Sequence, residues 1–363
     1  MRYSFSWGPF YPAWPGGLRL RLEVEDGVVR EVGVELLQPP SPAPEAWAGL
    51  RPGEALLQVE RLCAASSWAH SLAFCQALEA LAGLEVPERA RFIRLLLAEL
   101  ERIAAHLLTA GKVLKEAGLS STGLGLLDLR EEVLELRRRI TGRRFFPGLN
   151  VPGGLGRDLE EVGAVAEWVR RFKEPVYRLA HRVISARPEV SALIGSGLLT
   201  REFAEEHGLS GPVARGSELA QDLRRDQPYA AYGAVPPEVV TQAGGDIFAR
   251  WVVLLLEVFE SLRLLERAVE EMPAGPVCVQ GIDGLPAGEA QSRVEAPDGR
   301  LTLRVAVGED GRLSGLWRTA PGSVHLAALP KALVGQRLEM VGVIVASWGF
   351  KTVGGKIDKC CQM

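Results

Sequence analysis

The sequence lacks the features that mark several common classes of protein. Among its 363 residues only five are cysteines, at positions 63, 75, 278, 360 and 361. They do not form the dense framework of a secreted disulfide-rich domain, so a reducing compartment is expected. The longest uncharged apolar runs, 251–256 and 341–350, are far shorter than the roughly 20 residues that a membrane-spanning helix needs. Any attachment to a membrane is therefore expected to come through partner proteins.

The chain also lacks an excess of charge of either sign. Its 42 Lys and Arg residues against 45 Asp and Glu give a formal net charge of -3, which provides no basic field for nucleic acid. Arginines do cluster at 137–139 and 143–144, where a solvated helix face or pairing with a neighbouring subunit is expected. With 47% hydrophobic residues, the chain is long enough to bury a large core.

What the chain does contain is a distinctive turn. From Arg61 to Gln76, a loop with Cys63 leads directly into an apolar helix that carries His70. A nickel-iron site needs two thiolates three positions apart on such a turn, because both sulfur atoms must reach one ion. Here the second of these positions is Ser66. The turn has the layout of a metal site but only one thiolate.

This stretch resembles the Arg-x-Cys-Gly-x-Cys-x-x-x-His signature of [NiFe] hydrogenase large subunits, especially the energy-converting, membrane-bound group that includes formate-hydrogenlyase-like members. It is equally similar to the corresponding stretch of the 49 kDa quinone-site subunit of respiratory complex I, also called its D subunit, which has no metal. Residues 130–158, 211–232 and 292–300 also resemble this family. The resemblance covers essentially the whole chain. It implies a mainly α fold (α+β), with a core bundle of long helices and small β sheets.

The chain departs from both branches of the family at their functional positions. Hydrogenases of this group have Asp-Pro-Cys-x-x-Cys near the C-terminus, where this chain reads Gly-Phe-Lys-Thr-Val-Gly at 349–354. Only Cys63 remains of four thiolates, so neither a nickel-iron centre nor any other cofactor is expected on this chain. The tyrosine and histidine that meet quinone in complex I correspond to Ala64 and Pro15. Neither side chain can form a hydrogen bond, so quinone reduction by the same pair is not expected.

Two further positions follow from the resemblance. Tyr11 replaces the first histidine of a Gly-Pro-x-His-Pro segment, and its hydroxyl can donate to a carbonyl oxygen. The alternative is a loop tyrosine that fills a pocket. Glu116 falls where the family has an aspartate implicated in coupling, and the alternative is a helix-end carboxylate paired with Lys112 or Lys115.

The resemblance thus implies a cavity that receives electrons or relays a conformational change. His70 has a plain alternative role as a helix-start histidine bonded to the neighbouring loop, with Cys63 as a buried thiol. Cys75 lies five residues after His70 and should point away from it. The candidate cavity residues are Tyr11, Cys63, Ser66 and His70, with Glu116 and Arg130 tuning the charge nearby.

The pattern along the chain predicts three parts. Residues 1–60 should hold a β hairpin, with its turn at Asp26-Gly27, and a proline-rich connection. Residues 61–275 should form the helical bundle, and residues 276–363 a β segment and a tail that returns to the core site. Helices are expected over 67–84, from 87–88 onward, over 128–142, over 157–186 with a kink at Pro175, and over 246–272; strands are expected at 292–300, 301–307 and 313–318.

The family resemblance also implies partners. It predicts a peripheral subunit on the cytoplasmic face of the cell membrane, in an ion-pumping oxidoreductase complex. The chain would pack against a small subunit that carries an iron-sulfur cluster and is similar to the B subunit of complex I. A protein similar to the C subunit of complex I and antiporter-like membrane subunits would join them. A quinone or another small acceptor would be its ligand. Two alternatives stay open: a structural coupling subunit without an active site, and a divergent [NiFe] hydrogenase.

Overall fold

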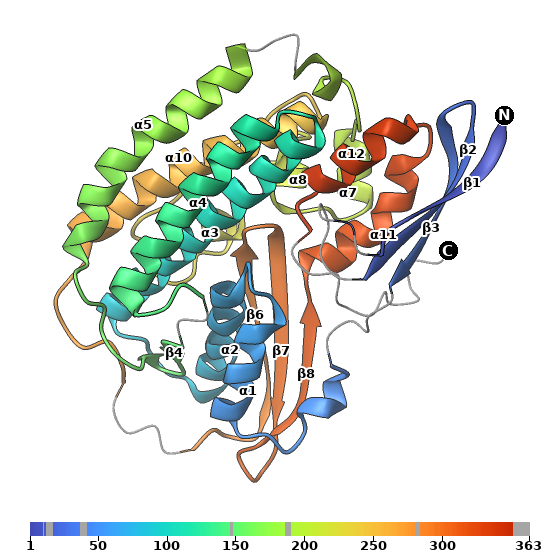
Figure 1. The fold of residues 1–363 in the computed structure, drawn as a ribbon. Helices are drawn as coiled ribbons and strands as arrows, with labels where there is room; N and C mark the ends of the chain where they lie inside the picture. The colour runs from blue at the N-terminus through green and yellow to red at the C-terminus, as the bar shows by residue number, and fades with distance from the viewer. Residues whose placement is uncertain are drawn as a thin grey trace.

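A computed structural model describes residues 1–9, 11, 17–36, 42–145, 148–185, 190–279 and 284–350. A bundle of long helices makes up one side of the molecule, and two three-stranded antiparallel sheets flank it (Figure 1). The fold is therefore mainly α with small sheets, as the resemblance implied. One large apolar core extends from strand β2 (Leu18–Glu25) through the bundle to the last described helix, α12 (Val341–Ser347).

The bundle forms because its helices carry continuous apolar stripes. It consists of α3 (Glu88–Glu116), α4 (Ser120–Thr141), α5 (Gly163–Ser185) and α10 (Ile247–Glu271). On α3 the apolar residues recur at three- and four-residue steps, which places them on one face of a helix. Helix α10 begins where the Asp246 carboxylate accepts a hydrogen bond from the backbone N–H of Ala249 at 2.7 Å, a typical N-cap contact. The buried stripe residues of α3 include Phe92, Leu95, Leu96, Leu100, Ile103 and Leu107.

The two sheets lie on different sides of the bundle (Figure 1). The N-terminal sheet has the order β1-β2-β3 and turns at Asp26-Gly27, as predicted. Helix α2 (Ser67–Ala82) packs on strands β6 and β7 of the other sheet, so the segment after the Cys63 turn is held between the bundle and this sheet. The other strands are β1 (Arg2–Trp7), β3 (Val28–Leu36), β4 (Asn150–Val151), β5 (Gly154–Leu155), β6 (Gly288–Ala296), β7 (Gly299–Val307) and β8 (Leu313–Thr319).

Shorter helices complete the fold. Helices α11 and α12 lie beside the N-terminal sheet and the end of α3 (Figure 1). The sequence pattern had not indicated either of them. The short helices are α1 (Pro52–Val59), α7 (Arg201–Glu206), α8 (Gly211–Arg215), α9 (Leu223–Asp226), α11 (Pro321–Leu333) and α12.

Several predicted boundaries were wrong. Helix α4 begins at Ser120 rather than 128, α5 begins at Gly163 rather than 157, and the turn between β6 and β7 falls at 297–298. The early start of α4 has a packing reason. A Cβ atom on Gly123 would lie 2.7 Å from the backbone oxygen of Gly111 on α3, so the glycine allows two helices to cross closely.

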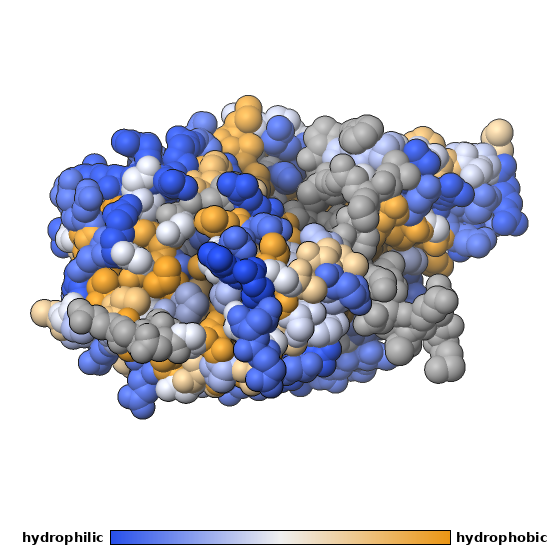
Figure 2. Space-filling view, turned by 90° about the horizontal axis from the view of Figure 1, so that it is seen from below, coloured by the Kyte–Doolittle hydropathy of each residue, from blue (hydrophilic) through white to orange (hydrophobic). Residues whose placement is uncertain are grey.

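Figure 2 shows the face seen from below, where hydrophobic residues gather among hydrophilic ones over part of the molecule. Within the described ranges, no helix is both long enough and apolar enough to cross a membrane.

Candidate functional site

The Cys63 turn holds its polar groups in internal contacts. Cys63 is 1% exposed, and its carbonyl oxygen accepts a hydrogen bond from the N–H of Ser66 at 3.3 Å. His70 is also buried; its Nδ1 lies 2.7 Å from the backbone oxygen of Ser66, and Nη1 of Arg318 lies 3.2 Å from its Nε2. Because a guanidinium can only donate, Nε2 accepts and Nδ1 carries the proton. His70 is thus bonded to the neighbouring loop.

These contacts do not fit a nickel-iron centre. Burial and the nearby Arg318 charge lower the pKa of His70 to about 3, so the ring is neutral and both nitrogens are engaged. Burial, with a further contribution from Asp298, raises the pKa of the Cys63 thiol, which disfavours the thiolate that a metal requires. Cys75 lies near Arg94 and away from this turn. In the described part of the chain, no group of three His, Cys, Asp or Glu residues is arranged to hold a metal.

A buried carboxylate caps helix α2. Ser66 occupies the N-cap position of this helix, and its side chain makes no capping bond. Instead, Glu101 of α3 accepts hydrogen bonds from the N–H groups of Trp68 at 2.8 Å and Ala69 at 2.9 Å. A carboxylate at a helix N-terminus is favourable because four N–H groups there lack partners within the helix. Glu101 therefore fixes the start of the helix that carries His70.

Burial raises the pKa of Glu101 to about 7, although Arg137 and the two backbone hydrogen bonds oppose the shift. Arg137 belongs to the arginine run that the sequence placed on a solvated face or at a subunit contact. The structure buries this residue, with 2% of it exposed. Its Nε and Nη2 have no hydrogen-bond partner among the described residues. Its neighbour Arg138 does lie on the surface, where it pairs with Glu135.

Glu101 and Arg137 line a small cavity beside the Cys63 turn. Its volume is about 10 Å³, the space of about one water molecule. Ala64, which is exposed, also lines this cavity. Arg130 also reaches the cavity and donates from Nη1 to Glu131 at 3.0 Å, while its Nε is buried without a partner among the described residues. The lining residues are Ala64, Ala65, Glu101, Ala104, Ala105, Leu108, Arg130, Leu134, Arg137 and Phe145.

Tyr11 and Glu116 form a second contact at the other end of α3. The Tyr11 hydroxyl donates to Oε2 of Glu116 at 2.5 Å. Partial burial, together with Glu116, raises the pKa of Tyr11, so the phenol keeps its proton. The ring of Trp7 meets that of Tyr11 edge to face at a centroid distance of 5.0 Å. Among the described residues, Glu116 forms no ion pair with Lys112 or with any other lysine.

The structure thus divides the predicted cavity residues into three groups. Cys63, Ser66 and His70 share one turn, Tyr11 bonds Glu116, and Arg130 reaches the cavity at Ala64 and Ala65. Helix α3 connects them, because it supplies Glu116 and much of the cavity wall. Pro15 and residues 351–363, which include the last two cysteines, lie outside the described residues.

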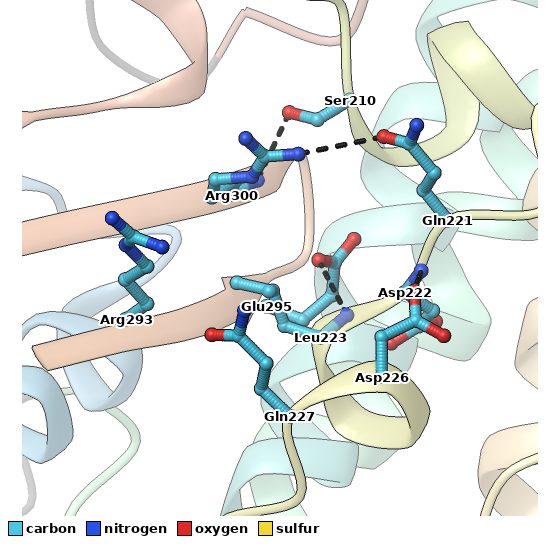
Figure 3. A pocket seen from close by; sticks show the side chains of 9 residues that line it. All are labelled: Ser210, Gln221, Asp222, Leu223, Asp226, Gln227, Arg293, Glu295 and Arg300. Carbon is cyan, nitrogen blue, oxygen red and sulfur yellow. Dashed lines mark hydrogen bonds between the residues drawn. The ribbon is translucent and has the colours of Figure 1, made fainter.

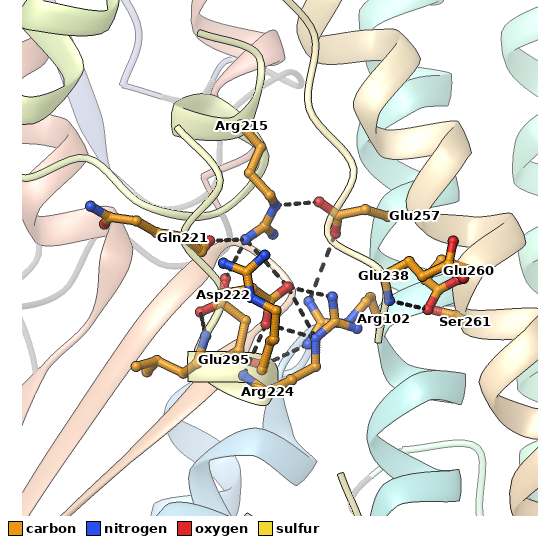
Figure 4. A network of polar contacts seen from close by, with 12 residues as sticks. Arg102, Arg215, Gln221, Asp222, Arg224, Glu238, Glu257, Glu260, Ser261 and Glu295 are labelled. Atoms are coloured by element: carbon orange, nitrogen blue, oxygen red, sulfur yellow. Dashed lines mark hydrogen bonds and ion pairs between the residues drawn. The ribbon is translucent and has the colours of Figure 1, made fainter. Parts of the chain in front are cut away.

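A network of buried charges supports the same helix (Figure 4). Arg215 donates to Glu257 at 2.6 Å and to Glu295 at 2.8 Å. Arg224 donates to Asp222 at 2.6 Å and to Glu99 of α3 at 3.1 Å. Both arginines are buried, and their hydrogen bonds tie the loop that holds them to α3, α10 and β6.

Two histidines add to the buried polar groups. Nε2 of His106 lies 2.8 Å from Oε2 of Glu257. Nε2 of His325 accepts from the N–H of Ser210 at 3.5 Å, and burial lowers the pKa of His325 to about 4. Neither histidine lines the cavity beside the Cys63 turn.

A larger pocket lies elsewhere, between the β6–β7 turn and helix α9 (Figure 3). Its volume is about 290 Å³, and Arg293 and Arg300 project toward it from the two strands. Glu295 in its wall accepts from the N–H of Leu223 at 3.3 Å. None of the predicted cavity residues lines this pocket.

Sequence reasoning missed Glu101 and Arg137. A signal for Glu101 was present, because Glu99, Glu101 and Arg102 interrupt the apolar stripe of α3, and charged residues in such a stripe must be paired when buried. For Arg137 there was no signal, since it stands in a run of three arginines.

Known proteins resemble this chain over nearly its whole length. The family model described as "Respiratory-chain NADH dehydrogenase, 49 Kd subunit" matches residues 116–284. A D subunit of NADH-quinone oxidoreductase from Chloroherpeton thalassium is 30% identical over 382 residues, covering 97% of this chain and 86% of the relative. The D subunit from Geobacillus kaustophilus is also 30% identical, with 97% and 96% covered, and that from Rickettsia bellii is 29% identical, with 98% of each chain covered.

A solved structure has the same fold. A chain of the membrane-bound sulfane sulfur reductase, an archaeal respiratory membrane complex, superposes with a TM-score of 0.90 at 25% identity, and 96% of each chain is covered. The helical bundle with its flanking sheets and Cys63 turn thus defines a protein of the hydrogenase large subunit and complex I class. Within that class, the chain belongs to the family of the 49 kDa subunit of complex I, the D subunit of NADH-quinone oxidoreductase.

Proposed function

We propose that this chain is a peripheral-arm subunit of a membrane-bound respiratory oxidoreductase related to complex I. The observation that carries the proposal is similarity over the whole chain, in sequence to the D subunits of NADH-quinone oxidoreductases and in fold to a chain of a respiratory membrane complex. In this role it lies on the cytoplasmic face and packs against a small subunit with an iron-sulfur cluster. A protein similar to the C subunit of complex I and antiporter-like membrane proteins complete the complex, which moves ions.

The chemistry of the Cys63 turn supports an oxidoreductase subunit without a nickel-iron centre. The turn offers one buried thiol and a neutral His70 with both nitrogens bonded. A complex I-type quinone reaction is also disfavoured, because Ala64 offers no side-chain hydrogen bond. The electron acceptor of the proposed complex is therefore not bound by the tyrosine and histidine that meet quinone elsewhere in the family. Tyr11 and Glu116 meet at the C-terminal end of α3, where their hydrogen bond links the N-terminal segment to that helix.

Purification from membranes tests this proposal. An affinity tag on this chain should bring down, from detergent-solubilised membranes, a small subunit with cysteine-bound iron-sulfur clusters, together with membrane subunits. Mass spectrometry identifies these proteins, and acid-labile sulfide measures the clusters. Recovery of the chain alone, from the soluble fraction, would contradict the proposal.

One observation favours a second candidate, a coupling subunit without an active site. The cavity beside the Cys63 turn has a volume of only about 10 Å³, as expected where a former ligand site has been filled by side chains. This candidate predicts the same partners, but no ligand bound at the cavity. Ligand binding at the cavity therefore distinguishes the two candidates.

A further inference from the structure

The strongest unexplained feature is the buried guanidinium of Arg137. The side chain is about 2% exposed, yet its Nε and Nη2 have no partner among the described residues. Unpaired donors buried in this way cost roughly 1–3 kcal/mol each, so a structure rarely keeps them without use. The opposite charges that act on Arg137 are those of Glu101 and Glu60. Neither lies within the 4.0 Å of an ion pair with Arg137.

Arg137 lines the small cavity beside the Cys63 turn, and a second arginine lines it too. The Nε atom of Arg130 is likewise buried without a partner in the described part of the chain, and Arg130 lines the same cavity. The rest of the wall is mostly alanine and leucine with Phe145. Two guanidinium groups in an apolar surround attract a negative atom strongly, because little water screens their charge.

Size and charge define what can enter. A volume of about 10 Å³ takes the terminal atom of a ligand and not a ring, and the exposed Ala64 marks where such a ligand would extend outward. Glu101 is the acidic residue among those that line the cavity, and its charge interacts with that of Arg137. Other charged or titratable groups near Glu101 are Arg102 of the same helix and Cys63.

We propose that this cavity binds the narrow, singly charged end of an anionic acceptor, held by Arg137 and Arg130, with Glu101 taking up a proton as the anion binds. The inference rests on the proposed function and names the ligand class of its site. Ionised Glu101 repels an incoming anion, whereas protonated Glu101 does not. The terminal sulfur of a polysulfide chain and the oxygen of a small carboxylate share this chemistry.

Thiocyanate is a suitable probe, since it is narrow and keeps its charge over the working pH range. Calorimetric titration of the whole purified complex at pH 6 to 9 should show saturable binding. Because the pKa of Glu101 is about 7, affinity should fall above that pH and approach a tenfold loss per pH unit. Glu101→Gln should abolish this pH dependence while retaining an oxygen for the N–H groups of α2.

Matched arginine variants test the site itself. Arg137→Leu should weaken thiocyanate binding at least tenfold, whereas Arg138→Leu, which removes the adjacent surface arginine, should leave it unchanged. If Arg137→Leu prevents assembly of the complex, Arg137→Lys is the variant that tests the site. Lysine keeps the positive charge but lacks the two free guanidinium donors, so Arg137→Lys should bind thiocyanate several-fold more weakly than the wild type. Unchanged binding in the assembled variant, or equal loss in Arg137→Leu and Arg138→Leu, would overturn the inference.

Competition identifies the source of the anion. Displacement of thiocyanate by sodium tetrasulfide would indicate a sulfur chain, and displacement by sodium formate would indicate a carboxylate. Failure of this inference is distinct from failure of the proposed function. The iron-sulfur content and subunit composition of the same preparations report on assembly, whether or not the cavity binds an anion.

Discussion

Removing the buried charge of Arg224 should destabilise the protein strongly. Arg224 is about 1% exposed and donates to both oxygens of Asp222 and of Glu99. Replacement with methionine keeps much of the volume but leaves the two carboxylates short of a partner. Breaking a buried ion pair in this way costs about 3–5 kcal/mol. For 363 residues, with an unfolding entropy of roughly 2.1 cal/mol/K per residue, a loss of about 4 kcal/mol lowers Tm by about 5 °C.

The adjacent residue provides the control for this prediction. Arg225 pairs with Asp226 at 2.9 Å, but 45% of its side chain is exposed. Such surface pairs contribute about 0–1 kcal/mol, so Arg225→Met should shift Tm by about 1 °C or less. Differential scanning fluorimetry of the two purified variants and the wild type measures both shifts. If Arg225→Met lowered Tm as much as Arg224→Met, or if neither changed it, the buried network would not stabilise the fold as argued.

Three further changes test other parts of the structure. Gly123→Ala should lower the free energy of unfolding, measured in urea, by about 1–3 kcal/mol, because the new Cβ meets a backbone oxygen of α3. Gly163→Ala is the control: its Cβ would have no atom within 4 Å, so it should be neutral or stabilising by up to about 1 kcal/mol. The pKa of His70 is about 3 in the folded protein and near 6.5 when unfolded, so its stability contribution is present above pH 6.5 and is lost as pH falls. His70→Gln should reduce the pH slope of stability between pH 6 and 4 by up to about 1.4 kcal/mol per unit, and an unchanged slope would refute a neutral buried ring. Tyr11→Phe removes the hydrogen bond to Glu116 and should cost about 1 kcal/mol at this half-exposed site, as measured by urea titration; no change would mean that the bond contributes nothing.

The fold was predictable wherever local pattern decides structure. The apolar stripe of α3, the Asp246 cap of α10 and the Asp26-Gly27 hairpin are all visible in the sequence. The start of α4 was not, because Gly123 resembles a helix breaker until its contact with α3 is known. Helix α12 was missed because it is buried on every side and therefore shows no helical period.

The site was less predictable than the fold, because its key contacts join distant residues. His70 and Cys63 were located from their motif, and the bond of His70 to its own loop was anticipated. The cap of α2 comes from Glu101, more than 30 residues away, and no local rule predicts it. Arg137 looked like a surface residue, because burial depends on how α4 packs on α3 rather than on its neighbours in sequence.

Metal content of the purified complex is the sharpest test of the proposed assignment. The proposed function places iron-sulfur clusters in a partner subunit and no nickel-iron centre on the Cys63 turn. Elemental analysis should therefore find iron in proportion to acid-labile sulfide and no stoichiometric nickel. An activity assay on the same preparation should find no hydrogen uptake. One nickel per copy of this chain, with hydrogen turnover, would contradict the assignment and would mean that other ligands rebuild the hydrogenase site.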